Sequence, residues 1–368
     1  VNLIDTSKER MAKVRRGEMP FLELGALELL REHKPRVFDG GLCESNLAVR
    51  ESDVVIVTLG TPLDEYQNPR LDAVMKPLLS YGANLDGKLV ILRSTVFPGT
   101  TQRVAKALPK SLVAFCPERI LQGHAIRELR TLPQIVSATT PKAYEAAWSL
   151  FATLGVPIVP AAVEEAELAK LMLNSWRYVS FAVGNAFDRL ATDLGVEYKR
   201  VEAVMKDGYS RADALPSPGF AAGPCLLKDT MQLVAAARDG FPLGMAARAV
   251  NEGVPETIVR KLRDIHGPLE GATIGILGMA FKADNDDTRD SLSFRLKKQL
   301  EWAGCQVLCS DEFARGFGWA TKEEVLEKCS GIVTGVGHSA YRGLVVPNGV
   351  VAVDLFGVTQ ERTWEHVT

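Results

Sequence analysis

A cysteine followed closely by a lysine and an aspartate is the part of this 368-residue sequence with the clearest capacity for chemistry. The stretch PGFAAGPCLLKDT places Cys225 after a glycine- and proline-rich approach, with Lys228 and Asp229 three and four residues later. A lysine or a helix N-terminus favours the nucleophilic thiolate, and a nearby carboxylate can hold water for hydrolysis. Cysteines are more often small buried apolar residues. The local pattern alone leaves both interpretations open.

Lys170 and Asn174 form a second candidate pair, in the stretch AELAKLMLNSW. They lie four residues apart in a segment that predicts a helix, so their side chains share one face. An ammonium group and an amide placed there could stabilise an oxygen that becomes negative during a reaction. A solvated helix face explains the same spacing.

Asp5 ends the first expected strand, where a carboxylate can bind both hydroxyls of a dinucleotide ribose. A simple turn or cap explains a lone acid equally well. The glycine-rich phosphate loop should precede such an acid by about 20 residues. We therefore expect a strand and the pattern G-x-G-x-x-G upstream of Val1.

The segment GMAFKADNDDTR supplies Lys282 and Arg289 after another expected strand. Its glycine spacing is not that of a dinucleotide fingerprint. The two cations could hold a phosphate or diphosphate, the arginine through a bidentate fork. Paired with the acidic residues of DNDD, they could instead form a surface salt-bridge cluster.

The elements that must position these residues follow an alternating strand and helix pattern over residues 1–160, which predicts a mostly parallel sheet. Expected strands are 1–4, 54–59, 89–92, 112–116, 134–137 and 156–159, with helices at 22–32 and 101–108. Residues 161–265 lack strand patterns and begin with one helix of about thirty residues. The alternation resumes over 266–368, with strands near 272–278, 306–309, 331–334 and 350–353. We expect three domains with these bounds.

Composition argues against several classes of protein. The 43 basic and 45 acidic residues nearly balance, which gives no sign of a nucleic-acid surface. No apolar stretch is long enough to span a bilayer, and the N-terminal residues lack a signal-peptide layout. Cys305 and Cys309 are four apart without a further Cys or His to complete a zinc site. We expect a cytoplasmic protein with reduced thiols, no metal and no membrane or nucleic-acid partner.

Taken in order, these blocks resemble the UDP-glucose/GDP-mannose dehydrogenase family. The collinear counterparts are VNLIDTSKERMAKVRRGEMPFLELGALELL, VVIVTLGTPLDE, LRSTVFPGTT, CPERILQGHAIREL, AELAKLMLNSW, PGFAAGPCLLKDT and ILGMAFKADNDDTRDS. The resemblance implies two Rossmann-like parallel-sheet α/β domains joined by a long central helix and a helical domain. Residues 1–160 would bind NAD, 161–265 would form a homodimer, and 266–368 would bind the nucleotide-sugar.

The resemblance also implies a reaction. The protein would use NAD to oxidise the C6 hydroxyl of a UDP-sugar, UDP-glucose or a UDP-N-acetylhexosamine, to a uronic acid. Cys225 would capture the aldehyde as a thiohemiacetal and then carry a thioester that water hydrolyses. GDP-mannose is the alternative substrate, and a catalytically silent nucleotide-sugar-binding protein is the alternative function.

The resemblance assigns residues to each role. The catalytic set is Cys225, Asp229, Lys170, Asn174, Thr95 and Glu118. The cofactor set is Asp5, Gly60, Thr61, Pro62, Ser94 and Thr95, and the acid favours NAD over NADP. The substrate set is Lys228, Lys282, Arg289, Gly219 and Phe220, where Lys228 would either place the substrate or favour the thiolate.

Three positions depart from the family pattern. The cysteine follows AAGP where the family has GGS, which changes its approach. Gln122 stands where many members carry a second glutamate. The segment DLFG, residues 354–357, replaces DGRN, so an arginine expected to reach the neighbouring subunit's substrate is absent from that position.

Overall fold

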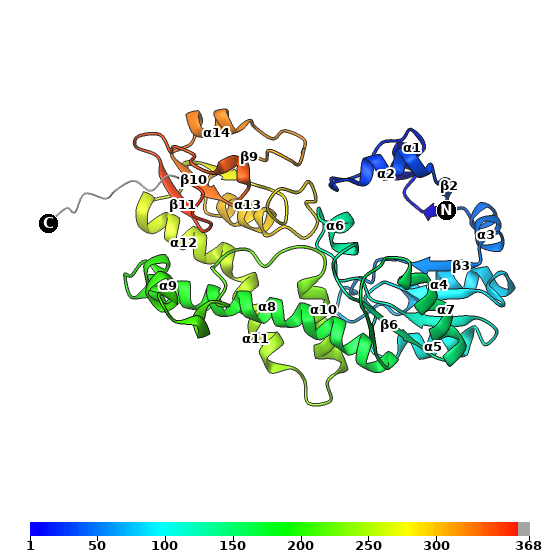
Figure 1. Cartoon of the computed structure of the whole chain (residues 1–368). Helices are drawn as coiled ribbons and strands as arrows, with labels where there is room; N and C mark the ends of the chain where they lie inside the picture. Colours follow the sequence, from blue (N-terminus) through cyan, green and yellow to red (C-terminus); the bar gives the residue numbers. More distant parts are fainter. Residues whose placement is uncertain (360–368) are drawn as a thin grey trace. The chain divides into compact units, whose positions relative to one another are not determined.

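The computed structural model describes residues 1–359, except for the side chains of Asp39, Leu42 and Cys43 (Figure 1). The chain forms two compact units. The first unit comprises Val1–Asn174 and Lys228–Gly240, and the second comprises Ser175–Leu227 and Phe241–Thr368. Two of the three boundaries fall inside helices, α8 (Val163–Asp193) and α10 (Leu226–Ala236), and the third follows α10. The α/β fold class expected from the sequence is confirmed, whereas the three-domain division stays a prediction.

The first unit contains a five-stranded sheet in the order β3-β4-β5-β6-β7. Its strands are β3 (Val54–Val57), β4 (Leu89–Leu92), β5 (Leu112–Phe115), β6 (Gln134–Ala138) and β7 (Ile158–Pro160). Its helices are α4 (Asp72–Tyr81), α5 (Thr100–Ala107), α6 (Ala125–Leu129) and α7 (Pro141–Ala152). The strands β3, β4 and β5 run parallel, but β6 runs antiparallel to β5. The expectation of a mostly parallel sheet is confirmed, with the pairing of β5 and β6 as the antiparallel exception.

The core of this sheet lies on both of its faces. Along β4, Val90 and Leu92 belong to one apolar cluster, while Leu89 and Ile91 belong to the other. All four side chains are buried. A strand covered on both faces reads as a continuous apolar run, which is why LVIL was recognisable in the sequence.

The N-terminal residues form a separate two-stranded parallel sheet in the same unit. Its elements are β1 (Asn2–Asp5), α1 (Lys8–Arg15), α2 (Ala26–His33), β2 (Arg36–Asp39) and α3 (Leu42–Arg50). The strand β2 was not expected from the sequence. The helix expected at 22–32 begins only at Ala26, because Gly25 precedes it in the left-handed conformation with φ 78°.

The second unit combines helices with a four-stranded parallel sheet in the order β11-β10-β8-β9. The strands are β8 (Thr273–Leu277), β9 (Gln306–Ser310), β10 (Gly331–Thr334) and β11 (Val351–Asp354). The helices not yet given are α9 (Tyr198–Lys206), α11 (Pro242–Glu252), α12 (Val254–His266), α13 (Leu292–Trp302) and α14 (Lys322–Lys328). Short 3₁₀ turns occupy Gly82–Leu85, Ser210–Ala212 and Ser339–Tyr341. The carboxyl ends of the strands therefore lie at one sheet edge, where α/β proteins bind ligands.

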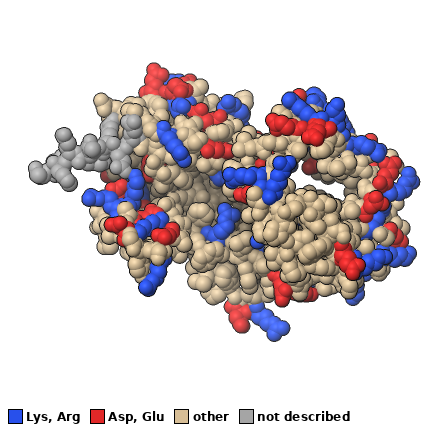
Figure 2. All heavy atoms as spheres, in the orientation of Figure 1, with Lys and Arg blue, Asp and Glu red and all other residues tan. Residues whose placement is uncertain are grey.

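The surface carries both signs of charge. Figure 2 shows Lys and Arg interspersed with Asp and Glu over the face in view, without one continuous patch of either sign. Over residues 1–359, none of the helices combines the length and the apolar character that a bilayer span would need.

Candidate active site

Five of the residues singled out from the sequence form one continuous polar chain in the first unit. Thr61 Oγ1 donates to the Thr95 carbonyl at 2.6 Å, and Lys228 Nζ donates to Thr61 Oγ1 at 3.1 Å. Lys228 also pairs with Asp229, which accepts from Asn174 Nδ2 at 2.6 Å. We call these five residues the Thr61–Asp229 chain. They come from the loops after β3 and β4 and from the helices α8 and α10, so four distant segments meet here.

The carboxylate of Asp229 is the centre of this chain. Asp229 is 0% exposed and Asn174 is 5% exposed, and Gln232 Nε2 donates to the second Asp229 oxygen at 3.3 Å. A buried charge is costly unless it is paired and hydrogen-bonded. The ammonium group of Lys228 and the two amides meet that requirement. These three bonds hold the Asp229 carboxylate in one position.

Lys170 lies one turn before Asn174 on α8, and its side chain is half-buried. The helix expected from the sequence is therefore present at the spacing that puts the two residues on one face. The role of Lys170 and Asn174 at a developing oxyanion stays a prediction.

The cofactor residues predicted after β3 and β4 lie at the carboxyl ends of these parallel strands. Ser94 Oγ donates to the Leu59 carbonyl at 2.6 Å and so ties the two strand ends together. A Cβ placed on Gly60 would meet no atom within 4 Å, which leaves the segment before Thr61 and Pro62 open to a ligand. This open strand edge fits a dinucleotide.

Asp5 ends β1 and has a local structural partner. Its Oδ1 accepts from the Ser7 amide at 2.7 Å, and Ser7 in turn caps α1 by accepting from the Arg10 amide. The simple turn that the sequence offered as the alternative to ribose binding by Asp5 is thus present. Binding of a ribose by its carboxylate stays a prediction.

Glu118 is held by an arginine that the sequence reasoning did not single out. Arg93, 9% exposed, forms an ion pair with Glu118 and also donates to the Cys116 carbonyl at 3.2 Å. The other Glu118 oxygen accepts from the backbone amides of Arg119 and Ile120 at 2.8 and 3.0 Å. The only signal was the position of Arg93 in LRST, directly before two predicted site residues.

Glu167 is a second residue that was missed. Its fully buried carboxylate accepts from the amides of Gly99 and Thr101 at 2.6 and 2.9 Å and from Thr101 Oγ1 at 2.6 Å. These are groups at the N-terminus of α5, where a negative charge is favourable. Glu167 thereby fixes the loop FPGT to the helix that carries Lys170.

Cys225 lies in the second unit, exposed, directly before the first residue of α10. The loop before it depends on Gly223, which has φ 94° and whose added Cβ would lie 2.5 Å from the Phe281 ring. The Gly223 amide donates to the Asp290 carbonyl at 3.1 Å. The unusual AAGPC loop therefore needs its glycine for a close approach to Phe281.

Gly219 and Phe220, both predicted to contact substrate, belong to the same loop. Asn185 of α8 holds Gly219 twice: its Oδ1 accepts from the Gly219 amide at 2.8 Å, and its Nδ2 donates to the carbonyl at 3.0 Å. Asn185 also donates to Asn251 at 2.9 Å. The loop is thus anchored to α8 at its start.

A cavity of about 640 Å³ opens next to this loop in the second unit. Its walls include four aromatic side chains and two cations, namely Phe181, Phe220, Phe281, Phe356, Lys282 and Arg342. Flat aromatic walls suit a base or sugar ring, and the cations suit phosphates. Phe356 belongs to the DLFG segment, and its ring lies against Gly219. The sequence reasoning found Lys282 and Phe220 and missed the other four, although Phe281 and Phe356 lie in segments that it quoted, GMAFKADNDDTR and DLFG.

Arg289 forms the surface salt bridge that the sequence left open as the alternative to phosphate binding. Its guanidinium forms hydrogen bonds with both Asp287 oxygens at 2.6 to 3.1 Å, and its side chain is 57% exposed. The Asp287 bonds raise the pKa of Arg289, and Cys225 is among the smaller electrostatic influences that raise it further. The contact of Arg289 with a substrate stays a prediction.

The described part of the chain contains no group of three or more His, Cys, Asp or Glu side chains that could hold a metal ion. The groups described above are an exposed thiol, a buried carboxylate with its amides and ammonium group, an open strand edge and a cavity with aromatic walls.

Three domain models of one protein family match the chain in sequence order. The NAD binding domain of the UDP-glucose/GDP-mannose dehydrogenase family matches residues 1–155, its central domain matches 164–253, and its UDP binding domain matches 275–361. The three matches together cover most of the sequence.

Curated relatives have related names. The UDP-N-acetyl-D-mannosamine dehydrogenase of Methanocaldococcus jannaschii is 28% identical over 361 residues, covering 92% of this chain and 80% of the relative. The UDP-N-acetyl-D-glucosamine 6-dehydrogenase of Pseudomonas aeruginosa is 27% identical over 369 residues, covering 93% and 83%. The UDP-glucose 6-dehydrogenase of Bacillus subtilis is 27% identical over 327 residues, covering 84% and 70%.

Solved structures share the fold. The UDP-D-ManNAc dehydrogenase of Pyrococcus horikoshii has a TM-score of 0.87 and 25% identity, covering all of this chain and 92% of that chain. A UDP-glucose dehydrogenase from Pyrobaculum islandicum has a TM-score of 0.85 and 24% identity, covering 98% and 90%.

Proposed function

The chain belongs to the UDP-glucose/GDP-mannose dehydrogenase family, and on that premise we propose that it oxidises the C6 alcohol of a UDP-sugar to a carboxylate, with NAD as cofactor and Cys225 as nucleophile. One observation carries the proposal. The loop that presents the exposed Cys225 also supplies Phe220 to the wall of the nucleotide-shaped cavity and packs Gly223 against Phe281 of the same wall. The thiol and the cavity are thus built from one segment.

The cofactor would be held by the open strand edge at Gly60, Thr61, Pro62 and Ser94, together with Asp5. When bound, NAD accepts the hydride removed in each oxidation.

Cys225 performs the covalent chemistry in this proposal. After the first oxidation, its sulfur adds to the C6 aldehyde, and the aldehyde oxygen takes a proton to give a thiohemiacetal. Removal of hydride from that carbon, with loss of the hydroxyl proton, leaves a thioester. Water then adds to the thioester carbon and the carbon–sulfur bond breaks, which releases the carboxylate and returns the thiol. The tether keeps the reactive aldehyde from leaving between the two oxidations.

The groups of the Thr61–Asp229 chain supply proton transfer and charge stabilisation. We assign Asp229 the role of orienting the water that hydrolyses the thioester, because it is a buried carboxylate already held by amides and an ammonium group. Lys170 and Asn174 are assigned the stabilisation of the negative oxygen that develops in the two covalent intermediates. Lys228 is committed to Thr61 and Asp229, which favours a role in orienting Asp229 over direct contact with the sugar.

We assign Glu118 a positioning role. Arg93 pairs with one of its oxygens and two backbone amides donate to the other, so the carboxylate is fixed in a position to orient water or substrate. Thr95 contributes its backbone carbonyl to Thr61, and its side chain is assigned to the same water.

The substrate we propose first is a UDP-N-acetylhexosamine, with UDP-glucose second. Relatives named for UDP-N-acetylmannosamine and UDP-N-acetylglucosamine support that order, and the model that matches residues 275–361 is described as a UDP binding domain. Lys282 and Arg342 would meet the diphosphate, and the phenylalanine rings would meet the base or the sugar.

A homodimer is proposed from the exposed apolar face of α8. Trp176, Val183, Phe187 and Leu190 are exposed by 67, 38, 39 and 57%, and they recur at intervals of three, four and seven residues. Such a stripe is typical of a helix that packs against a second copy. Light scattering should give twice the mass of the chain, and Leu190→Glu should reduce that mass to that of a monomer.

The direct test follows NADH absorbance with a panel of UDP-N-acetylmannosamine, UDP-N-acetylglucosamine, UDP-glucose and GDP-mannose. The expected result is NADH formation with one of the UDP-sugars, at two NADH for each sugar consumed. If calorimetry shows that a UDP-sugar binds but no NADH is formed, the protein is a catalytically silent nucleotide-sugar-binding protein. One NADH for each sugar would contradict the thioester route.

A further inference from the structure

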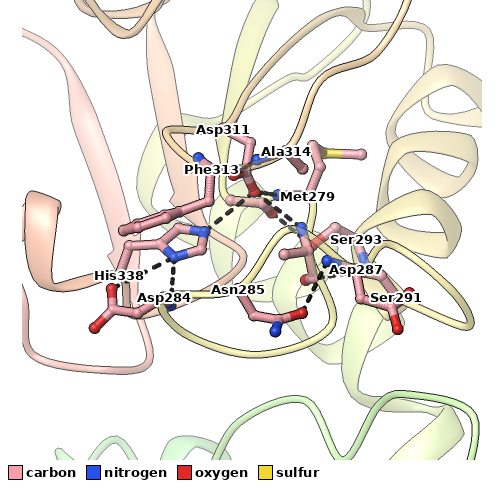
Figure 3. A network of polar contacts seen from close by, with 12 residues as sticks. Met279, Asp284, Asn285, Asp287, Ser291, Ser293, Asp311, Phe313, Ala314 and His338 are labelled. Carbon is pink, nitrogen blue, oxygen red and sulfur yellow. Dashed lines mark hydrogen bonds and ion pairs between the residues drawn. The ribbon is translucent and has the colours of Figure 1, made fainter. Parts of the chain in front are cut away.

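The fully buried side chains of a histidine and an aspartate are hydrogen-bonded to each other and to the loop from Met279 to Asp284 (Figure 3). Asp311 directly follows β9, and His338 lies four residues after β10. His338 Nε2 is 3.1 Å from Asp311 Oδ2, and Phe313 and Tyr341 flank the imidazole ring at 4.9 and 5.3 Å between centroids. Neither residue belongs to the reaction chemistry assigned above.

The hydrogen bonds fix the state of this pair. The Asp284 amide donates to His338 Nδ1 at 2.9 Å, so that nitrogen is an acceptor and carries no proton. The ring proton is therefore on Nε2, which donates to Asp311. His338 acts as a neutral bridge between the carboxylate and the loop.

Asp311 is the fixed end of the bridge. Its Oδ2 also accepts from the amides of Met279 and Ala280 at 2.6 and 2.9 Å, and its Oδ1 accepts from those of Phe313 and Ala314 at 2.8 and 2.7 Å. Burial alone would raise the pKa of Asp311, but the bonds from His338, Ala314 and Ala280 hold it well below its usual value. The carboxylate is thus a permanent acceptor for two strand-end loops.

As a consequence, hydrogen bonds hold the loop on both sides of residues 281–283, which line the cavity. Asp311 holds Met279 and Ala280, and His338 holds Asp284. The three residues between these ties, 281–283, are the loop residues that line the cavity. Ser339 adds an outer tie, since its amide and hydroxyl donate to Asp284 Oδ1 at 2.8 and 2.9 Å.

The loop needs such support. Asp284 has φ 53°, a left-handed conformation that is uncommon for a residue other than glycine. Lys282 projects beside the Phe281 ring, with its Nζ 5.9 Å from the ring centroid. A cation on a loop held at one end only would lose side-chain and backbone freedom on binding, which lowers affinity.

We propose that His338 is a positioning residue for nucleotide-sugar binding, which acts through Asp284 to hold Phe281 and Lys282 in the cavity wall. The inference rests on the proposed function in assigning a UDP-sugar to this cavity. It assigns no chemical step to the imidazole.

Two substitutions separate the two bonds of the histidine. In His338→Gln the amide nitrogen takes the place of Nε2, so the bond to Asp311 is kept and the acceptor for Asp284 is lost. In His338→Asn the amide oxygen takes the place of Nδ1, so the bond to Asp284 is kept and the donor to Asp311 is lost. His266→Gln is the matched control, because His266 lies in the same unit and is hydrogen-bonded to Ser330 at 2.8 Å, away from the loop.

The test is calorimetric titration of each full-length variant with UDP alone, followed by NADH. Loss of the Asp284 bond in His338→Gln should weaken UDP about tenfold, the effect of about one hydrogen bond, while NADH affinity stays unchanged. His338→Asn should retain more of the UDP affinity, and His266→Gln should match the unsubstituted protein. In turnover, His338→Gln should raise KM for the sugar nucleotide and leave kcat unchanged.

Unchanged UDP affinity in a folded His338→Gln variant would overturn the proposal, as would an equal loss of UDP and NADH affinity. Should that variant not fold, Asp284→Gly decides, because Asp284 lies on the surface and glycine keeps its left-handed conformation without strain, while the side-chain tie to Ser339 is lost and the loop is held less firmly at this residue. It should weaken UDP by a smaller factor, and an unchanged affinity would again overturn the proposal. UDP binding without NADH formation in the unsubstituted protein would refute the proposed oxidation and still test the positioning role.

Discussion

The side chains of Asn174 and Asp229 meet in a hydrogen bond of 2.6 Å, although they are 55 residues apart in the sequence and lie on different helices. Both side chains are buried, and the bond joins an amide donor to a carboxylate. The polar neighbours of Asp229 therefore stabilise its buried carboxylate, and substitution of each neighbour should have a measurable effect.

Replacement of Asn174 by alanine should leave one oxygen of a buried carboxylate without its donor. We expect a loss of about 1–3 kcal/mol in the free energy of unfolding, measured by urea denaturation. NADH production should fall with it. Asn84→Ala is the control: Asn84 donates to the neutral Asn46 at 2.9 Å, so its removal strands no charge. Equal stability losses in the two variants would contradict the special position of Asn174.

Thiol alkylation should select Cys225. It is exposed, whereas Cys116, Cys305, Cys309 and Cys329 are buried. Burial raises the pKa of Cys116 to about 12 and those of Cys309 and Cys329 to about 11, which further lowers their reactivity. Brief treatment with iodoacetamide, followed by peptide mass mapping, should label Cys225 before these four. Faster labelling of any buried cysteine would contradict the structure.

The covalent mechanism predicts a particular failure in Cys225→Ser. A hydroxyl is a far weaker nucleophile than a thiolate, so carboxylate formation should fall by several orders of magnitude, whereas UDP binding should persist. Mass spectrometry of the products should show no uronic acid under conditions in which the unsubstituted protein converts all of its substrate. Carboxylate formed at the normal rate would rule out the thioester.

Glu167 should support the loop between β4 and α5. Glu167→Gln replaces one accepting oxygen by an NH2 donor that faces groups needing an acceptor, so we expect a cost of about 1–3 kcal/mol in unfolding free energy. Glu164→Gln, one turn earlier on α8, is the matched control, because Glu164 is exposed and accepts only a 3.3 Å bond from Gln102. A control variant destabilised as much as Glu167→Gln would show that the burial of Glu167 carries no extra weight.

The sequence predicted elements best where one local pattern decides them. The run LVIL was assigned correctly because β4 is covered on both faces, and the long helix was assigned from its apolar spacing. The strand β2 was missed, since RVFD is short and follows a proline. The direction of β6 leaves no trace in its own residues, because pairing is decided by the neighbouring strand.

The residues of the candidate site also divide into those that local spacing predicts and those that it does not. Spacing placed Lys170 and Asn174 on one helix face, but no spacing could link Arg93 to Glu118, 25 residues away, or Glu167 to Thr101, 66 residues away. Such partners are brought together only by the packing of strands and helices. The roles of the site residues stay predictions.

The pH dependence of stability should reveal Asp311. Its pKa in the folded protein lies below the ordinary value of 3.8, so below that pH the unfolded state binds more protons and stability falls. The contribution is complete above about pH 4 to 5 and is lost as the pH falls toward the folded pKa. Asp311→Asn should have a lower thermal midpoint than the unsubstituted protein at neutral pH, and the gap should narrow as the solution is acidified.

The control for this prediction is Asp72, whose pKa is lowered to about 2 by hydrogen bonds from Arg70 and Lys76 on the surface. Salt screens exposed charges but not buried ones, so added salt should remove the pH-dependent effect of Asp72→Asn and leave that of Asp311→Asn in place. A gap for Asp311→Asn that stays constant with pH, or that disappears in salt, would show that the buried carboxylate does not hold its charge through His338 and the backbone amides of Ala314 and Ala280.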